Sequence, residues 1–73
     1  MATLTPTETK VLGWAAQGLG NKQMAIKLDI CEGTIKNHLT SIYTKLRALN
    51  RANAVAIGLA RHLITFEEER QTS

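Results

Sequence analysis

Hydrogen-bonding side chains gather on one face of a predicted helix over residues 32–47. Projected at about 100° per residue, the apolar side chains of this segment fall on one side, and short polar or basic side chains fall on the other. The polar side carries Lys36, Asn37, Thr40, Ser41 and Thr44. Lysine can donate to guanine O6 and N7, asparagine can pair with adenine through two hydrogen bonds, and serine or threonine can contact either base type or a phosphate. The pattern favours a face that reads the edges of nucleic-acid bases.

The charge balance of the chain agrees with this interpretation. The 73 residues have a formal net charge of +3, but three of the six acids stand together at 67–69. Residues 1–66 hold eight Lys or Arg against three acids, a net charge of +5, and no Glu stands between Gly33 and Phe66. A solvated helix surface usually mixes Glu with Lys, so the acid-free stretch favours a polyanionic partner over a merely soluble basic face.

Other chemistry finds little support in the sequence. No paired carboxylates, no nucleophile beside a base and no phosphate-cradling loop are present, so we expect no enzyme. No two of the residues Cys31, His38 and His62 are spaced closely enough to form a pair of metal ligands. We therefore expect neither metal nor cofactor. One cysteine cannot form an internal disulfide, which fits a reducing cytoplasm. No membrane span or signal peptide is recognisable, so we expect a cytoplasmic protein without membrane contact.

Four helices and no strands are predicted. Thr5 can cap a helix over 6–17, with Pro6 at its first position, Glu8 completing a capping box and Gly18 ending it in a left-handed conformation. Asn21 is predicted to cap the second helix, over 22–28. The fourth helix is predicted over 51–64. In the third, over 32–47, the apolar residues are spaced four, three and four apart and form one stripe: Ile35, Leu39, Ile42 and Leu46.

The arrangement predicts a compact all-α, four-helix domain over 1–66, followed by a disordered tail over 67–73. Residues 21–40 fit a helix-turn-helix, in which two helices are joined by a three-residue turn.

Several blocks of sequence carry a resemblance to a known family. They are Leu4-Thr5-Pro6 with Glu8, the run Thr34-Ile35-Lys36-Asn37-His38-Leu39, and Lys45-Leu46 followed by Asn50-Arg51. Together with matches elsewhere between residue 4 and about residue 63, they resemble the LuxR-type (GerE-like) DNA-binding domain of bacterial transcription regulators. The resemblance implies a third helix in the major groove of double-stranded DNA and a fourth helix that often mediates dimerisation. It also implies a receiver or ligand-binding domain preceding such a domain, and RNA polymerase as a further partner.

Residue roles follow from the resemblance and from the helical projection together. Base-reading positions fall on Lys36, Asn37 and Thr40 by resemblance, with Ser41 and Thr44 added by the projection. DNA-backbone contacts are expected from Asn21, Lys22, Thr34, His38, Lys45, Arg47 and Arg51. His38 has an equal alternative, which is packing beside the turn.

Five positions depart from the family's pattern, and one of them is Lys10, which stands where an acid is common. Asp29 replaces the usual Gly of the turn and can tolerate a left-handed conformation at some cost. Cys31 replaces the usual Ser cap, which predicts a looser start of the third helix. Ile26 replaces a charged residue and is expected to be an exposed apolar spot. Thr40 stands where some members carry a base-reading Lys, so the bases read here are expected to differ.

The fourth helix is apolar nearly all round, which in so small a domain favours a surface shared between two molecules. One side holds Ala54, Val55, Ile57 and Gly58; the other, the predicted homodimer interface, holds Ala52, Ala56, Leu59, Ala60 and Leu63. We therefore predict a sequence-specific transcription regulator that binds DNA as a dimer on half-sites about 10 base pairs apart. Two alternatives remain open: a helix-turn-helix module that pairs with another regulator without reading DNA, and a polymerase-associated, sigma-like helix-turn-helix.

Overall fold

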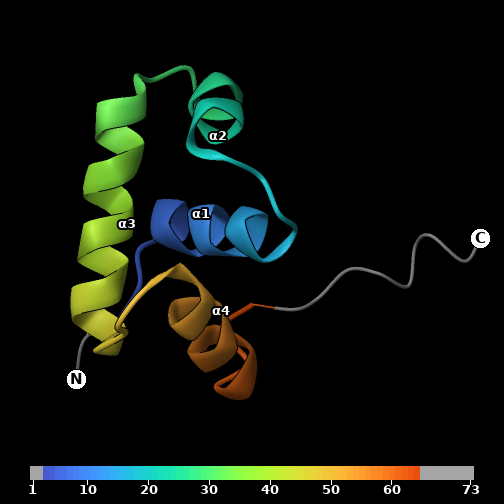
Figure 1. The fold of residues 1–73 in the computed structure, drawn as a ribbon, viewed down its shortest axis with the longest axis vertical. Coiled ribbons are helices and arrows are strands. Elements are labelled where there is room, and N and C mark those ends of the chain that lie inside the picture. Colours follow the sequence, from blue (N-terminus) through green and yellow to red (C-terminus); the bar gives the residue numbers. More distant parts are fainter. Residues whose placement is uncertain (1–2, 65–73) are drawn as a thin grey trace, which may run out of the picture.

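The computed structural model describes residues 3–64, which form four α-helices and contain no strand (Figure 1). The helices are α1 (Pro6–Ala16), α2 (Asn21–Leu28), α3 (Glu32–Leu46) and α4 (Arg51–Ala60). The predicted all-α, four-helix fold is confirmed. The predicted tail over 67–73 lies outside the described residues. No helix within 3–64 combines the length and apolar character that crossing a membrane requires.

α3 runs along one edge of the domain, and the other three helices lie on the same side of it (Figure 1). Contacts join α3 to α1, α2 and α4, and α1 also packs on α4. One side of α3 is therefore buried, and the opposite side faces out of the domain.

The start of α1 is the capping box that the sequence predicts. The Thr5 hydroxyl accepts from the Glu8 amide at 3.1 Å, and Glu8 Oε1 accepts from the Thr5 amide at 2.9 Å, with Pro6 at the first helical position. These reciprocal bonds satisfy two amides that the helix itself leaves without partners.

The predicted cap of α2 is wrong. Gly20 occupies the capping position, and Asn21 is the first residue of the helix rather than its cap. The Gln23 side chain accepts from the Gly20 amide at 2.8 Å. Asn21 is instead held by Arg51, because its side-chain oxygen accepts from that guanidinium.

All four helices end with the same backbone motif. A residue with positive φ follows the helix, and the next amide donates to the carbonyl five residues back, as in a Schellman motif. The positive-φ residues are Gly18 (93°), Asp29 (58°), Arg47 (58°) and His62 (60°). The closing bonds are Leu19 to Trp14, Ile30 to Ala25, Ala48 to Tyr43 and Leu63 to Gly58, at 2.8–3.1 Å. The residues that donate these bonds are all apolar and pack against the core: Leu19, Ile30, Ala48 and Leu63.

The same motif makes the fourth helix shorter than predicted. α4 ends at Ala60 and not at residue 64, because the chain reverses at His62 and the Leu63 amide closes onto the Gly58 carbonyl at 2.8 Å. The reversal returns Ile64 to the core, where it is 7% exposed. Leu63 is therefore not part of the helical face on which it was predicted. α1 and α3 each end one residue earlier than predicted.

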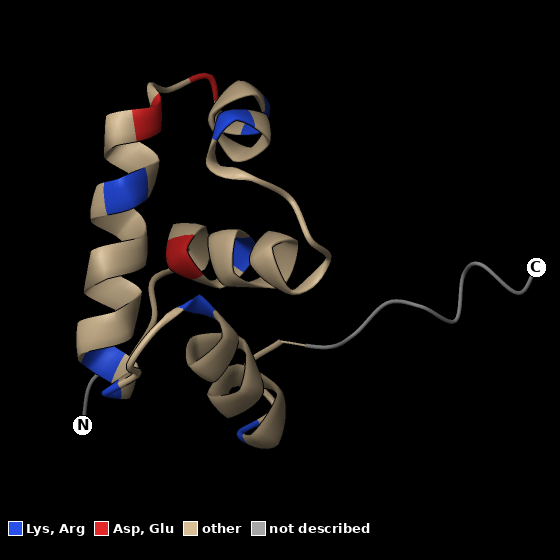
Figure 2. Cartoon of the chain, viewed as in Figure 1, with Lys and Arg blue, Asp and Glu red and all other residues tan. Residues whose placement is uncertain are grey.

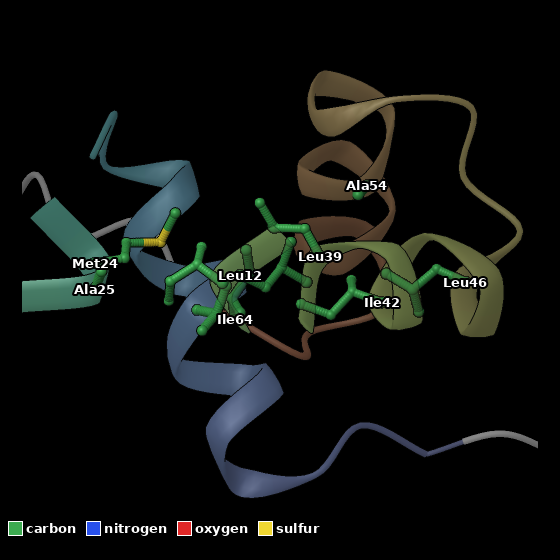
Figure 3. Packing of buried hydrophobic residues seen from close by; sticks show 10 residues of the cluster. Leu12, Met24, Ala25, Leu39, Ile42, Leu46, Ala54 and Ile64 are labelled. Carbon is green, nitrogen blue, oxygen red and sulfur yellow. The ribbon is translucent and has the colours of Figure 1, made fainter. Parts of the chain in front are cut away.

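The core is a continuous row of apolar side chains from α2 to the end of α3 (Figure 3). The predicted stripe of α3 is confirmed, since Ile35, Leu39, Ile42 and Leu46 are all at most 5% exposed. α1 contributes Val11 and Leu12. This packing fixes which side of α3 faces solvent.

Candidate nucleic-acid interface

The outward side of α3 carries four of the five residues that the projection placed there. Lys36, Asn37, Thr40 and Thr44 are exposed. Gly33 belongs to the same side, and a Cβ built on it would meet no atom within 4 Å. The one acid of α3 is Glu32, so acidic colour appears only at its first turn (Figure 2). These side chains form a shallow strip that donors and acceptors of a ligand can approach.

Ser41 does not belong to that strip, and its predicted outward orientation is wrong. Its hydroxyl donates to Glu8 Oε2 at 2.8 Å, and the bond is partly buried between α1 and α3. The physical reason is that Ser41 lies at the boundary between the outward and the buried sides of the helix. There, a buried carboxylate on α1 attracts its hydroxyl more than solvent does.

Glu8 is the one buried charged residue among residues 3–64, at 5% exposure. Its carboxylate accepts hydrogen bonds from Lys45 Nζ at 2.6 Å, from the Thr5 amide and from the Ser41 hydroxyl. Burial acts to raise the pKa of Glu8, but the hydrogen bonds from Lys45, Thr5 and Ser41, together with the charge of Lys45, outweigh it and lower the pKa to about 2. Glu8 is therefore ionised, and it ties the start of α1 to the last turns of α3.

This ion pair changes the expectation for Lys45. Its ammonium donates to Glu8 and, at 3.3 Å, to the Thr3 carbonyl, so its charge is neutralised within the domain. The sequence predicts Glu8 only as a cap. The long-range role was missed because a separation of 37 residues has no signature in local spacing.

The remaining predicted backbone-contacting residues divide into two groups. Lys22 and Arg47 are exposed, and Arg47 is also the positive-φ residue that ends α3. Thr34 and His38 are half-buried. Cys31 caps α3 without accepting a backbone amide, and its sulfur lies 3.3 Å from the Thr34 hydroxyl. Hydrogen bonding from the Thr34 side chain and from nearby amides lowers the pKa of the Cys31 thiol.

Arg51 connects two helix starts. Its guanidinium donates to the Leu19 carbonyl at 2.9 Å and to the Asn21 side-chain oxygen at 2.5 Å, so the first residue of α4 is fastened to the first residue of α2. Tyr43 lies beside this pair in a groove along α3. Sequence reasoning missed Tyr43, although its spacing of three from Thr40 and seven from Lys36 places it on their side of the helix.

The outer surface of α4 is apolar and exposed. Ala52, Ala56 and Ala60 are exposed, and Leu59 is half-buried. Two further apolar residues stand in solvent, the predicted Ile26 at 72% exposure and Leu49 at 87%. Leu49 lies in the loop before α4, three residues from Ala52 along the chain, and no sequence pattern singled it out.

Comparison with known proteins identifies the family. The model of the bacterial regulatory proteins of the luxR family (GerE) matches residues 2–57. This chain belongs to that family. Members are transcription regulators and not enzymes, and the helix-turn-helix that they share binds DNA.

Relatives of this luxR-family domain are longer proteins. The transcriptional regulatory protein YdfI of Bacillus subtilis is 42% identical over 64 residues, which span 88% of this chain and 30% of YdfI. The quorum sensing-dependent regulator RpaR of Rhodopseudomonas palustris is 46% identical over 61 residues, which span 84% of this chain and 25% of RpaR. The chain thus spans less than a third of the length of these two relatives.

Two solved structures share the fold. The response regulator ChrA of a heme-sensing two-component system superposes with a TM-score of 0.83 at 41% identity, over 88% of this chain and 32% of ChrA. The transcription factor GerE also has a TM-score of 0.83, at 25% identity, over 89% of this chain and 97% of GerE. The structure and the comparisons together make this chain a luxR-family helix-turn-helix domain.

Proposed function

We propose that this domain binds double-stranded DNA sequence-specifically, with α3 in the major groove. The observation that carries the proposal is the exposed strip of Lys36, Asn37, Thr40 and Thr44, which contains no acid. These side chains can donate hydrogen bonds to base edges or accept them. The small size of Gly33 and Thr40 lets the helix lie close to the bases. Ser41 and Lys45 are not in this proposal, because both are bonded to Glu8.

The first experiment is fluorescence anisotropy of the domain on a duplex, titrated over a series of salt concentrations. We expect the logarithm of the affinity to fall linearly with the logarithm of the salt concentration, by about 0.9 for each phosphate contacted. Absence of binding at low salt would contradict the proposal.

Sequence reading is tested with Lys36→Ala and Asn37→Ala on a duplex enriched from a random pool. Each change is expected to cost about 1–3 kcal/mol on that duplex and to relax the base preference at one position. Lys10→Gln is the matched control, since Lys10 is an exposed cation on α1 away from the strip. Unchanged specificity in both alanine variants would refute the assignment of the strip.

We further propose that two copies bind together through α4. Alanines four residues apart, at 52, 56 and 60, give this helix a flat exposed face on which a second helix can lie closely. Leu59 of the same helix and Leu49 of the loop before it add apolar area. The symmetric pair would bring two α3 helices to half-sites about one turn of DNA apart.

Ala56→Glu tests the pairing, because the residue is exposed and the change leaves the core intact. We expect cooperative binding to paired half-sites to be lost while binding to a single half-site is kept. Gln17→Glu, exposed at the end of α1, controls for the added negative charge. A wild-type domain that stays monomeric at millimolar concentration and binds one copy per paired site would rule the pairing out.

A role for this domain in signalling is proposed by analogy with one of its relatives. ChrA is a response regulator of a two-component system, and we propose that this domain likewise serves as the DNA-binding part of a regulator that has a separate signal-receiving domain and acts on RNA polymerase in the cytoplasm. A test is whether a receiver domain fused before the chain makes DNA binding depend on phosphorylation. Phosphorylation without any effect on DNA affinity would count against it.

A further inference from the structure

The two flanks of the α3 strip differ in charge. On the α1 flank, the carboxylate of Glu8 neutralises Lys45 and takes the hydroxyl of Ser41. On the other flank, the starts of α2 and α4 meet α3 and leave a groove of about 290 Å³. This groove is lined by Asn21, Lys36, Leu39, Thr40, Tyr43 and Arg51, none of which is acidic. An anion is therefore attracted to the second flank and not to the first.

Arg51 is fixed in this groove without being neutralised. Its two bonds go to the Leu19 carbonyl and to the Asn21 amide oxygen, which are both uncharged. Within the described part of the chain, the one ion pair is Glu8 with Lys45, so Arg51 keeps its positive charge. A guanidinium has five N–H donors, and two are used here, which leaves donors for a ligand. Because the side chain is already immobilised, binding loses less conformational entropy.

Tyr43 supplies a second donor in the same groove. Its ring packs against the core and its residue is half-buried. Among residues 3–64, its hydroxyl makes no hydrogen bond, and it is not among buried polar atoms left unsatisfied. The hydroxyl thus reaches solvent on a rigid ring and can donate to a group placed in the groove.

We propose that this groove seats one phosphodiester of the DNA backbone, with Arg51 supplying charge and the Tyr43 hydroxyl donating a hydrogen bond. The inference rests on the proposed DNA binding. The groove borders the strip at Lys36 and Thr40, so the backbone of a strand read by that strip would pass beside it. Asn21 is then a positioning residue, which acts by orienting Arg51. Contacts of this kind set the register of α3 on the duplex and carry no sequence information.

The test measures the affinity and salt dependence of wild type, Tyr43→Phe and Arg51→Gln on an enriched duplex and on an unrelated duplex. Tyr43→Phe keeps the packed ring and is expected to bind both duplexes about tenfold more weakly with an unchanged salt slope, because a neutral donor is removed. Arg51→Gln is expected to lower the salt slope by about 0.9, the value of one phosphate contact. Lys10→Gln is expected to leave affinity and slope at the wild-type values.

A second measurement does not depend on how Arg51→Gln folds. Single phosphates of the enriched duplex are replaced in turn by uncharged methylphosphonates. We expect one position at which the replacement weakens wild type but weakens Tyr43→Phe several-fold less, which would support the seat. Wild-type affinity in Tyr43→Phe, or no position whose effect depends on Tyr43, would overturn it. Failure of the wild-type domain to bind any duplex at low salt would overturn both the seat and the DNA-binding proposal.

Discussion

Removing the charge of Glu8 should make the domain markedly less stable and remove most of its sensitivity to acid. The pKa of Glu8 is lowered from 4.5 to about 2, which corresponds to about 3 kcal/mol of stabilisation at about 1.4 kcal/mol per pKa unit. Breaking one side of a fully buried ion pair costs about 3–5 kcal/mol, and this pair, in which the Lys45 side chain is 26% exposed, should fall at the lower end of that range. A 73-residue domain has roughly 4–11 kcal/mol of stability in total, and the loss is a large part of it.

The sign of the pH dependence follows from the direction of the shift. Because the folded state holds the proton more weakly than the unfolded state, the stabilisation is complete above pH 4.5 and is lost as the pH falls towards 2. Urea unfolding followed by circular dichroism between pH 7 and pH 2 measures this for wild type and Glu8→Gln. The difference between the two curves isolates Glu8, since the two proteins are otherwise identical in sequence.

We expect Glu8→Gln to be less stable than wild type by about 3 kcal/mol at pH 7, and the gap to close by the acid end of the range. Glu32→Gln is the matched control. That acid is exposed in the first turn of α3, and its removal should cost less than about 1 kcal/mol. Parallel pH curves for wild type and Glu8→Gln would refute the reasoning, because they would mean that the Glu8 carboxylate gains nothing on folding.

Five further substitutions test the packing and the helix ends, and each is measured by thermal or urea unfolding. Gly58→Ala should destabilise the domain by about 1–3 kcal/mol, because a Cβ there would lie 2.8 Å from a Leu12 methyl. Gly33→Ala should stabilise it by up to about 1 kcal/mol, because a Cβ there would lie in open space. Equal effects of the two changes would contradict the close packing at Gly58. Asp29→Gly should raise the free energy of unfolding by up to about 1 kcal/mol, since φ is 58° at this residue. Gly18→Ala should lower it by about 1–2 kcal/mol, since φ is 93° there. Lower stability of Asp29→Gly would show that the interactions of the aspartate side chain outweigh the backbone strain. Cys31→Ser should add about 1 kcal/mol, because the thiol makes no capping bond and a hydroxyl can accept one; no gain would show that the start of α3 is already satisfied.

Local spacing was enough to predict the helices and the side of α3 that faces out. A stripe such as Ile35, Leu39, Ile42 and Leu46 must turn inward to leave water, so the exposed residues opposite follow from periodicity alone. The start of α1 was equally predictable, because both bonds of its capping box join residues three apart. For the same reason the strip of Lys36, Asn37, Thr40 and Thr44 could be identified from helical spacing, and the roles of these residues in reading DNA stay a proposal.

Only the tertiary structure decided where α3 and α4 end and which polar groups meet. The left-handed turns at Arg47 and His62 have no sequence signature like that of Gly18; they form because each brings an apolar residue, Ala48 or Leu63, back onto the core. Burial of those side chains offsets a backbone cost of about 1–2 kcal/mol per residue, and that balance exists only once the core is assembled.

The side chains of Ser41, Lys45 and Arg51 were all predicted to be available for DNA, and the fold treats each differently. Ser41 and Lys45 are bonded to Glu8, 33 and 37 residues away, whereas Arg51 is held by uncharged oxygens and keeps its charge. The sequence by itself therefore determined the helices, the core stripe and the face that points outward, because these depend on neighbours within a few residues. Which cations remain free on that face depends on partners more than 30 residues away, and only the packed domain brings those partners together.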